Sequence, residues 1–123
     1  MEKKSILVVD DAPENIALLV GLLKNNYQVK AARSGEVALR IACSPAPPDL
    51  ILLDIVMPEM DGFEVCKHLK RNTTTSHIPV VFLSGHASSE ETERGLKVGG
   101  EAYLQKPVEP EKLFSTIEEI LSD

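Results

Sequence analysis

Three short runs of hydrophobic residues contain no polar position, and longer stretches with a helical period separate them. The runs are Ile6–Val9, Leu50–Leu53 and Val80–Leu83. A strand buried on one face alternates apolar with polar residues, whereas a strand in a parallel sheet is covered on both faces and stays apolar. The runs therefore predict central strands of a parallel sheet. Two weaker candidates, Tyr27–Ala32 and Glu101–Leu104, suit the edges of that sheet.

Between the predicted strands, apolar residues recur every three or four positions, which indicates helices with one buried face. The clearest faces comprise Ile16, Leu19, Val20 and Leu23, and Leu113, Ile117, Ile120 and Leu121. Pro110 suits a first helical turn, Ser34 suits an N-cap, and Asp61 with Glu64 forms a capping-box pattern. The stretch from Ser88 to Val98 is the least amphipathic, so we expect a helix that packs lightly and moves more easily.

Strands and helices thus alternate in the order βαβαβαβαβα. Right-handed crossovers convert this order into an α/β fold, a doubly wound five-stranded parallel sheet with strand order 2-1-3-4-5, as in flavodoxin-like proteins. The chain has 123 residues. That length predicts one domain over residues 1–123.

Polar side chains follow the predicted strands at their carboxyl ends. Asp10 and Asp11 follow the first strand, Asp54 the third, Ser84 the fourth and Lys106 the fifth. Open parallel sheets bind ligands at this edge, where the strand order reverses. That point lies between the first and third strands, so Asp10, Asp11 and Asp54 are expected to converge.

Three converging carboxylates repel one another, because two charges about 4 Å apart cost about 4 kcal/mol at an effective dielectric of about 20. A cation would relieve this repulsion. Oxygen ligands favour Mg²⁺ over zinc, and Mn²⁺ could substitute for Mg²⁺. An alternative interpretation is that the aspartates only cap helices, with Asp11 and Glu14 forming a capping box.

The remaining side chains at this edge complete a phosphoryl-transfer site. Lys106 supplies a cation for phosphate oxygens, and Ser84 supplies a hydroxyl donor. Attack by Asp54 on a phosphoryl donor would give an aspartyl phosphate, and Mg²⁺ would neutralise the developing charge.

Composition and charge exclude several classes of protein. The net charge is −6, from 19 acidic against 13 basic residues, so the phosphate backbone of nucleic acid would repel the domain. No signal peptide and no apolar stretch of membrane-spanning length is visible. Cys43 and Cys66 lie in predicted helices, and we interpret both as reduced core thiols of a cytoplasmic protein.

Four motifs, each after its predicted strand, carry a resemblance over nearly the whole chain. They are Val8–Asp11, Leu52–Gly62, Pro79–Gly85 and Tyr103–Pro107. In this order they resemble the receiver domains of bacterial two-component response regulators.

The resemblance implies a role for each matching residue. Asp54 would accept a phosphoryl group from a sensor histidine kinase or phosphotransfer protein. Asp10, Asp11 and the main-chain carbonyl of Val56 would join Asp54 in holding Mg²⁺. Lys106 would bind the phosphoryl group next to a cis Lys106–Pro107 peptide.

Ser84 and Tyr103 would form a switch that acts on the face made by the fourth helix, fifth strand and fifth helix. Such a chain would catalyse only its own phosphorylation and dephosphorylation, would control an output domain or partner protein, and could dimerise when phosphorylated.

Some positions at the predicted site differ among receiver domains. We hypothesise that apolar Val56 hinders water and prolongs the phosphorylated state, whereas His86 could order a water and shorten it. Gly85 is small, so it should leave the acceptor Asp54 open to its phosphoryl donor. His68 and His77 are expected on the surface, as is the polar loop 72–76.

The sequence disfavours three other classes of protein, and a degenerate receiver is the main alternative. A haloacid-dehalogenase-type phosphatase needs a second aspartate where this chain has Val56. A flavin-binding protein needs a phosphate-binding loop after the first strand, where Asp10 and Asp11 would instead repel phosphate. A nucleotide hydrolase needs a Gly-rich loop that ends in Lys-Ser/Thr, and this sequence lacks one. A degenerate receiver would act as a binding surface without phosphorylation. The sequence leaves open whether the chain stands alone or belongs to a longer regulator.

Overall fold

The computed structural model describes residues 3–85 and 88–122. Within these residues, five strands and five helices alternate. They are β1 (Ser5–Val9), α1 (Pro13–Leu23), β2 (Gln28–Ala32), α2 (Gly35–Ala42), β3 (Leu50–Asp54), α3 (Gly62–Arg71), β4 (Val80–Ser84), α4 (Ser89–Lys97), β5 (Ala102–Gln105) and α5 (Pro110–Leu121). All strands pair in parallel in the order β2-β1-β3-β4-β5. The predicted fold class and strand order are confirmed.

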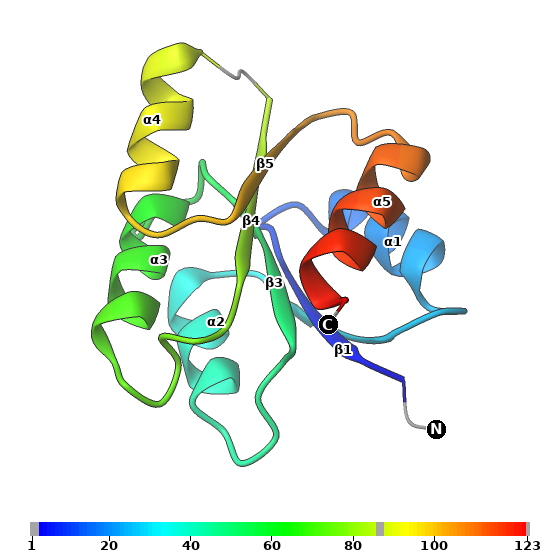
Figure 1. Ribbon diagram of the computed structural model, residues 1–123, viewed down its shortest axis with the longest axis horizontal. Helices are drawn as coiled ribbons and strands as arrows, with labels where there is room; N and C mark the ends of the chain where they lie inside the picture. Colours follow the sequence, from blue (N-terminus) through cyan, green and yellow to red (C-terminus); the bar gives the residue numbers. More distant parts are fainter. Residues whose placement is uncertain (1–2, 86–87, 123) are drawn as a thin grey trace.

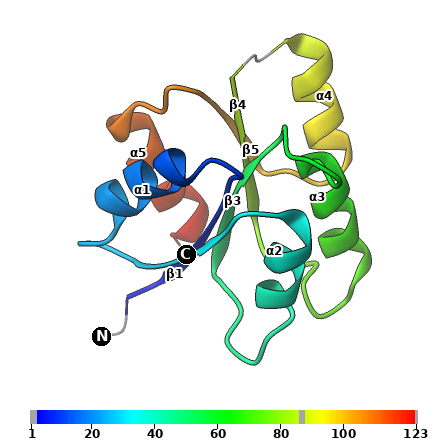
Figure 2. The same cartoon turned by 180° about the vertical axis from the view of Figure 1, so that it is seen from behind.

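Helices cover both faces of the sheet, with α1 and α5 on one side and α2, α3 and α4 on the other (Figure 1). The reverse view shows the same two layers around the strands (Figure 2). Successive side chains of one strand enter opposite layers: Ile6 and Val8 join the cluster under α1 and α5, whereas Leu7 and Val9 join the other cluster. Both faces are therefore buried, which explains why the central strands lack polar alternation.

Helix starts follow the predicted capping chemistry in most places. The Ser34 hydroxyl accepts from the amide of Val37, and Asp61 accepts from the amide of Glu64 at 2.9 Å. Pro110 lies in the first turn of α5. The capping-box interpretation of Asp11 is wrong, because the N-cap of α1 is Ala12 and α1 has no side-chain cap.

The helix α4 packs lightly, as predicted, and Gly95 is its one buried residue. The expectation that it is the least amphipathic helix is wrong, because apolar and polar residues are less separated on α1. A Cβ on Gly95 would lie 3.1 Å from the rings of Phe82 and Tyr103. Glycine thus lets α4 approach the sheet closely although the helix presents few apolar side chains.

Two expectations were wrong in detail. Cys66 is buried, but Cys43 is exposed at the end of α2 and does not belong to the core. Within the loop 72–76, Thr75 is buried because its hydroxyl donates to the carbonyl of Leu69 at 2.7 Å. The predicted surface positions of His68 and His77 are confirmed.

Within residues 3–85 and 88–122, no helix is both long and apolar enough to cross a membrane.

Candidate functional site

Three carboxylates meet at the carboxyl edge of the sheet. Asp10 directly follows β1, Asp11 begins the turn into α1, and Asp54 ends the neighbouring strand β3. Each offers an oxygen, and the three oxygens lie within 4.8 Å of one another. Asp10 and Asp54 are buried, and Asp11 is half-buried. The sequence-based prediction that these side chains converge is confirmed.

Lys106 joins this cluster from the end of β5. Its Nζ donates to Asp10 Oδ2 at 2.9 Å and to Asp54 Oδ1 at 3.0 Å. Burial alone would lower the pKa of Lys106, but the hydrogen bonds with the two aspartates outweigh it and raise the pKa. Lys106 therefore stays a cation. The Lys106–Pro107 peptide is cis, as the resemblance implied.

The cluster holds more negative than positive charge. Burial raises the pKa of Asp54, and the charges of Asp10 and Asp11 raise it further against the opposing effect of Lys106. One lysine thus does not fully compensate three carboxylates. An additional hard cation with oxygen ligands would compensate them, so these residues fit Mg²⁺.

The backbone after β3 fixes Asp54. Gly62 opens α3 directly against this strand end, and a Cβ at Gly62 would lie 2.4 Å from the main-chain oxygen of Asp54. The Gly62 amide donates to the carbonyl of Ile55 at 2.8 Å. Glu59, in the intervening loop, has a positive φ of 69°. The loop therefore folds back tightly, and only glycine fits where α3 meets the acceptor strand.

A carboxylate that the sequence analysis did not single out connects the two predicted switch residues. Glu91 Oε1 accepts from the Ser84 hydroxyl at 2.5 Å and from the Tyr103 hydroxyl at 2.6 Å. Burial raises the pKa of Tyr103, and the hydrogen bond to the Glu91 carboxylate raises it further. The spacing of Ser88 and Glu91 is that of a capping box, which could have placed Glu91 in the first turn of α4.

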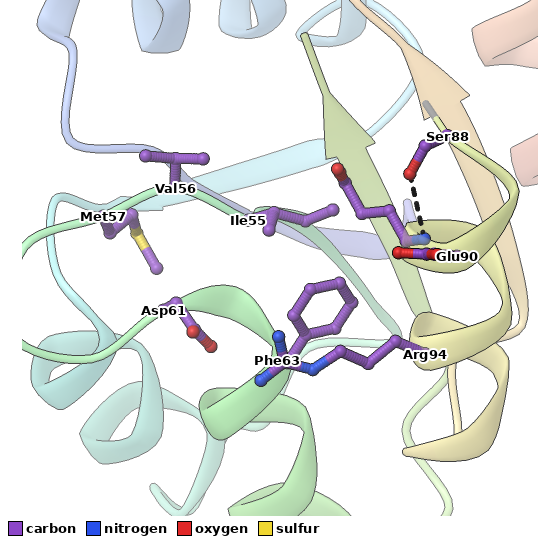
Figure 3. A pocket seen from close by; sticks show the side chains of 9 residues that line it. Ile55, Val56, Met57, Asp61, Phe63, Ser88, Glu90 and Arg94 are labelled. Carbon is purple, nitrogen blue, oxygen red and sulfur yellow. Dashed lines mark hydrogen bonds between the residues drawn. The ribbon is translucent and has the colours of Figure 1, made fainter. Parts of the chain in front are cut away.

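A shallow pocket adjoins the site between the β3–α3 loop and α4 (Figure 3). Val56 lies at its edge with 80% of its surface exposed. On the opposite side, the Arg94 guanidinium lies 4.5 Å from the centre of the Phe63 ring. A Cβ at Gly85 would meet nothing within 4 Å. His86 lies outside the described residues.

Comparison with known proteins identifies the family that this chain belongs to. The sequence profile of the response regulator receiver domain matches residues 6–118. The chain belongs to this family.

Two relatives show where such a receiver domain occurs. A protein described as a probable cyclic di-GMP phosphodiesterase of Vibrio cholerae is 51% identical over 104 residues, which are 85% of this chain. The match covers 23% of that relative, so this receiver domain spans less than a quarter of its length. The polar-differentiation response regulator DivK of Brucella ovis is 38% identical over 121 residues, 98% of each chain.

The receiver fold also matches solved structures. The structure of chemotaxis protein CheY4 of Vibrio cholerae superimposes with a TM-score of 0.91 at 32% identity, covering 97% of this chain and 99% of that chain. The chain is thus a receiver domain by sequence and by fold. Receiver domains are signalling modules, not conventional enzymes.

Proposed function

We propose that this receiver domain accepts a phosphoryl group on Asp54 and transmits its presence to an output domain or partner protein. One observation carries the proposal: Lys106 Nζ bridges Asp10 and Asp54 at 2.9 and 3.0 Å inside a cluster of three carboxylates. This arrangement combines a nucleophile, a cation and a set of oxygen ligands within one site.

The transfer forms one bond and breaks one bond. An Asp54 oxygen attacks phosphorus, while the bond from phosphorus to the donor breaks and its electron pair leaves with the donor. Lys106 pairs with Asp54 in the structure, and its ammonium would meet a phosphoryl oxygen on that carboxylate. Ser84 would supply a hydroxyl to another phosphoryl oxygen. Removal by water would break the new bond and return the carboxylate and inorganic phosphate.

Asp10, Asp11, Asp54 and the main-chain carbonyl of Val56 would hold Mg²⁺. When bound, Mg²⁺ supplies positive charge for the phosphoryl oxygens. Because Asp10 is already buried and its Oδ1 accepts from the amide of Ala12 at 2.9 Å, one ligand is fixed before any ion arrives. We also propose that residues 1–123 form a single receiver domain.

The donor would be the phosphohistidine of a sensor kinase or phosphotransfer protein. We infer a cytoplasmic location, where such donors act. The 51% identity to the Vibrio cholerae relative supports an enzymatic output, on the same polypeptide or on a separate partner. Ser84 and Tyr103 would change position on phosphorylation and alter the surface of α4, β5 and α5.

Acetyl phosphate with Mg²⁺ tests the proposal, with intact-protein mass as the readout. We expect the mass of one phosphoryl group on the wild type and none on Asp54→Asn. Glu59→Gln, which removes an exposed carboxylate from the same loop, should gain it normally. A folded wild type that gains no mass would favour a binding module that acts without phosphorylation. Sustained hydrolysis of a small phosphate ester, lost in Asp54→Asn, would favour a phosphatase.

A further inference from the structure

The Glu91 carboxylate links helix α4 to strands β4 and β5. It lies in the first turn of α4, and the same oxygen accepts from Ser84 at the end of β4 and from Tyr103 in β5. Bonds to a charged acceptor are about twice as strong as bonds between neutral groups. One carboxylate therefore accepts the protons of both hydroxyls.

The position of this carboxylate is fixed from two sides. The Ser88 hydroxyl accepts from the Glu91 amide at 3.1 Å, which holds the first turn of α4. The Tyr103 ring packs against Phe82 with centroids 5.9 Å apart and lies against Gly95 of α4. The ring is thus placed by packing, and Glu91 determines the direction of its hydroxyl.

Ser84 also borders the acceptor. In the pairing of β3 with β4, Asp54 lies opposite Leu83, the residue before Ser84. A serine hydroxyl donates a single proton. Its proton cannot be donated to Glu91 and to a phosphoryl oxygen on Asp54 at the same time.

We propose that Glu91 is a positioning residue that holds the Ser84 and Tyr103 hydroxyls in the unphosphorylated protein and competes with the phosphoryl group for the Ser84 proton. The inference rests on the proposed phosphorylation of Asp54. Phosphorylation then breaks the Ser84–Glu91 bond, and by linkage, loss of that bond favours phosphorylation.

The consequence reaches the first turn of α4, which belongs to the surface that is proposed to change on phosphorylation. Glu91 and Arg94 both line the pocket between the β3–α3 loop and α4. Figure 3 shows Arg94 at this pocket. When Ser84 no longer donates to Glu91, the Tyr103 hydroxyl still does. The first turn of α4 and the wall of this pocket are then less firmly tied to β4.

The first test measures the affinity for beryllofluoride, a phosphoryl mimic, in the presence of Mg²⁺ by fluorine NMR. Glu91→Gln keeps an accepting oxygen but loses the charge, so its bond to Ser84 is weaker in the unbound state. This variant should therefore bind several-fold more tightly than the wild type. Glu93→Gln removes the same charge from an exposed position of α4 and should bind like the wild type.

A double-mutant cycle separates the hydrogen bond from a general effect of charge. In a Ser84→Ala background, Glu91→Gln should no longer change the affinity. An unchanged affinity in the single variant, or an equal gain with and without Ser84, would overturn the inference. A wild type that binds no beryllofluoride would instead refute the proposed function.

The second test does not depend on phosphorylation. The chain has no Trp and two Tyr, so in a Tyr27→Phe background the ultraviolet emission comes from Tyr103. A carboxylate that accepts the phenol proton quenches tyrosine emission, and Glu91→Gln should therefore increase it. Emission that stays unchanged in a folded variant would show that Glu91 does not hold Tyr103.

Discussion

Gly62 is the position where one methyl group should disturb the acceptor most. In Gly62→Ala, the new Cβ would lie 2.4 Å from the main-chain oxygen of Asp54 and 2.9 Å from the Cα of Ile55. Ordinary contacts begin near 3.4 Å, so α3 and the strand end must separate by about 1 Å. Overpacking of this kind costs about 1–3 kcal/mol. The Tm should fall by roughly 5–10 °C in a domain of this size.

Thermal unfolding by circular dichroism measures this effect, and Gly21→Ala is the matched control. Gly21 is exposed within α1, and a Cβ there meets nothing within 4 Å. This control should gain about 0.5–1 kcal/mol from helix propensity. Gly62→Ala should also slow phosphorylation by acetyl phosphate, because Asp54 moves with its backbone. The reasoning is refuted if both alanine variants gain stability or if Gly62→Ala is phosphorylated at the wild-type rate.

Three further substitutions probe the site. Without Mg²⁺ at neutral pH, Asp54→Asn should raise the Tm, because the raised pKa of Asp54 means that its ionised form destabilises the fold. This gain should shrink as the pH falls through that raised pKa towards 3.8, and a constant gain would contradict the argument. Lys106→Ala should lower the free energy of unfolding in urea by about 3 kcal/mol, with partial recovery in Mg²⁺, whereas exposed Lys112→Ala should change it little. Val56→Asn should shorten the phosphorylated lifetime several-fold in a mass-based decay assay, and an unchanged decay rate would remove the hypothesis that Val56 hinders water.

The sheet was predictable because a strand that is buried on both faces is an uninterrupted hydrophobic run in the sequence. Leu50–Leu53 has no polar position, and all four residues are buried. The strand order followed from crossover handedness, and it brought Asp10, Asp54 and Lys106 together although Asp10 and Lys106 are 96 residues apart. Position at a strand end was therefore sufficient to predict the cluster.

The hydrogen bonds around α4 were not predictable in the same way. Glu91 is one of several acidic residues in a polar stretch of the sequence, and its two donors come from different strands. Thr75 and Cys43 show the same limit, because one local bond buries a threonine and one helix end exposes a cysteine. Residue type and period do not encode such local geometry.

A structure of the protein with Mg²⁺ and beryllofluoride tests the central claim most directly. We predict beryllofluoride on an Asp54 oxygen, Mg²⁺ bound by Asp10, Asp11 and Asp54, and Lys106 Nζ within hydrogen-bond distance of a fluorine. Beryllofluoride or Mg²⁺ bound away from these side chains would contradict the account.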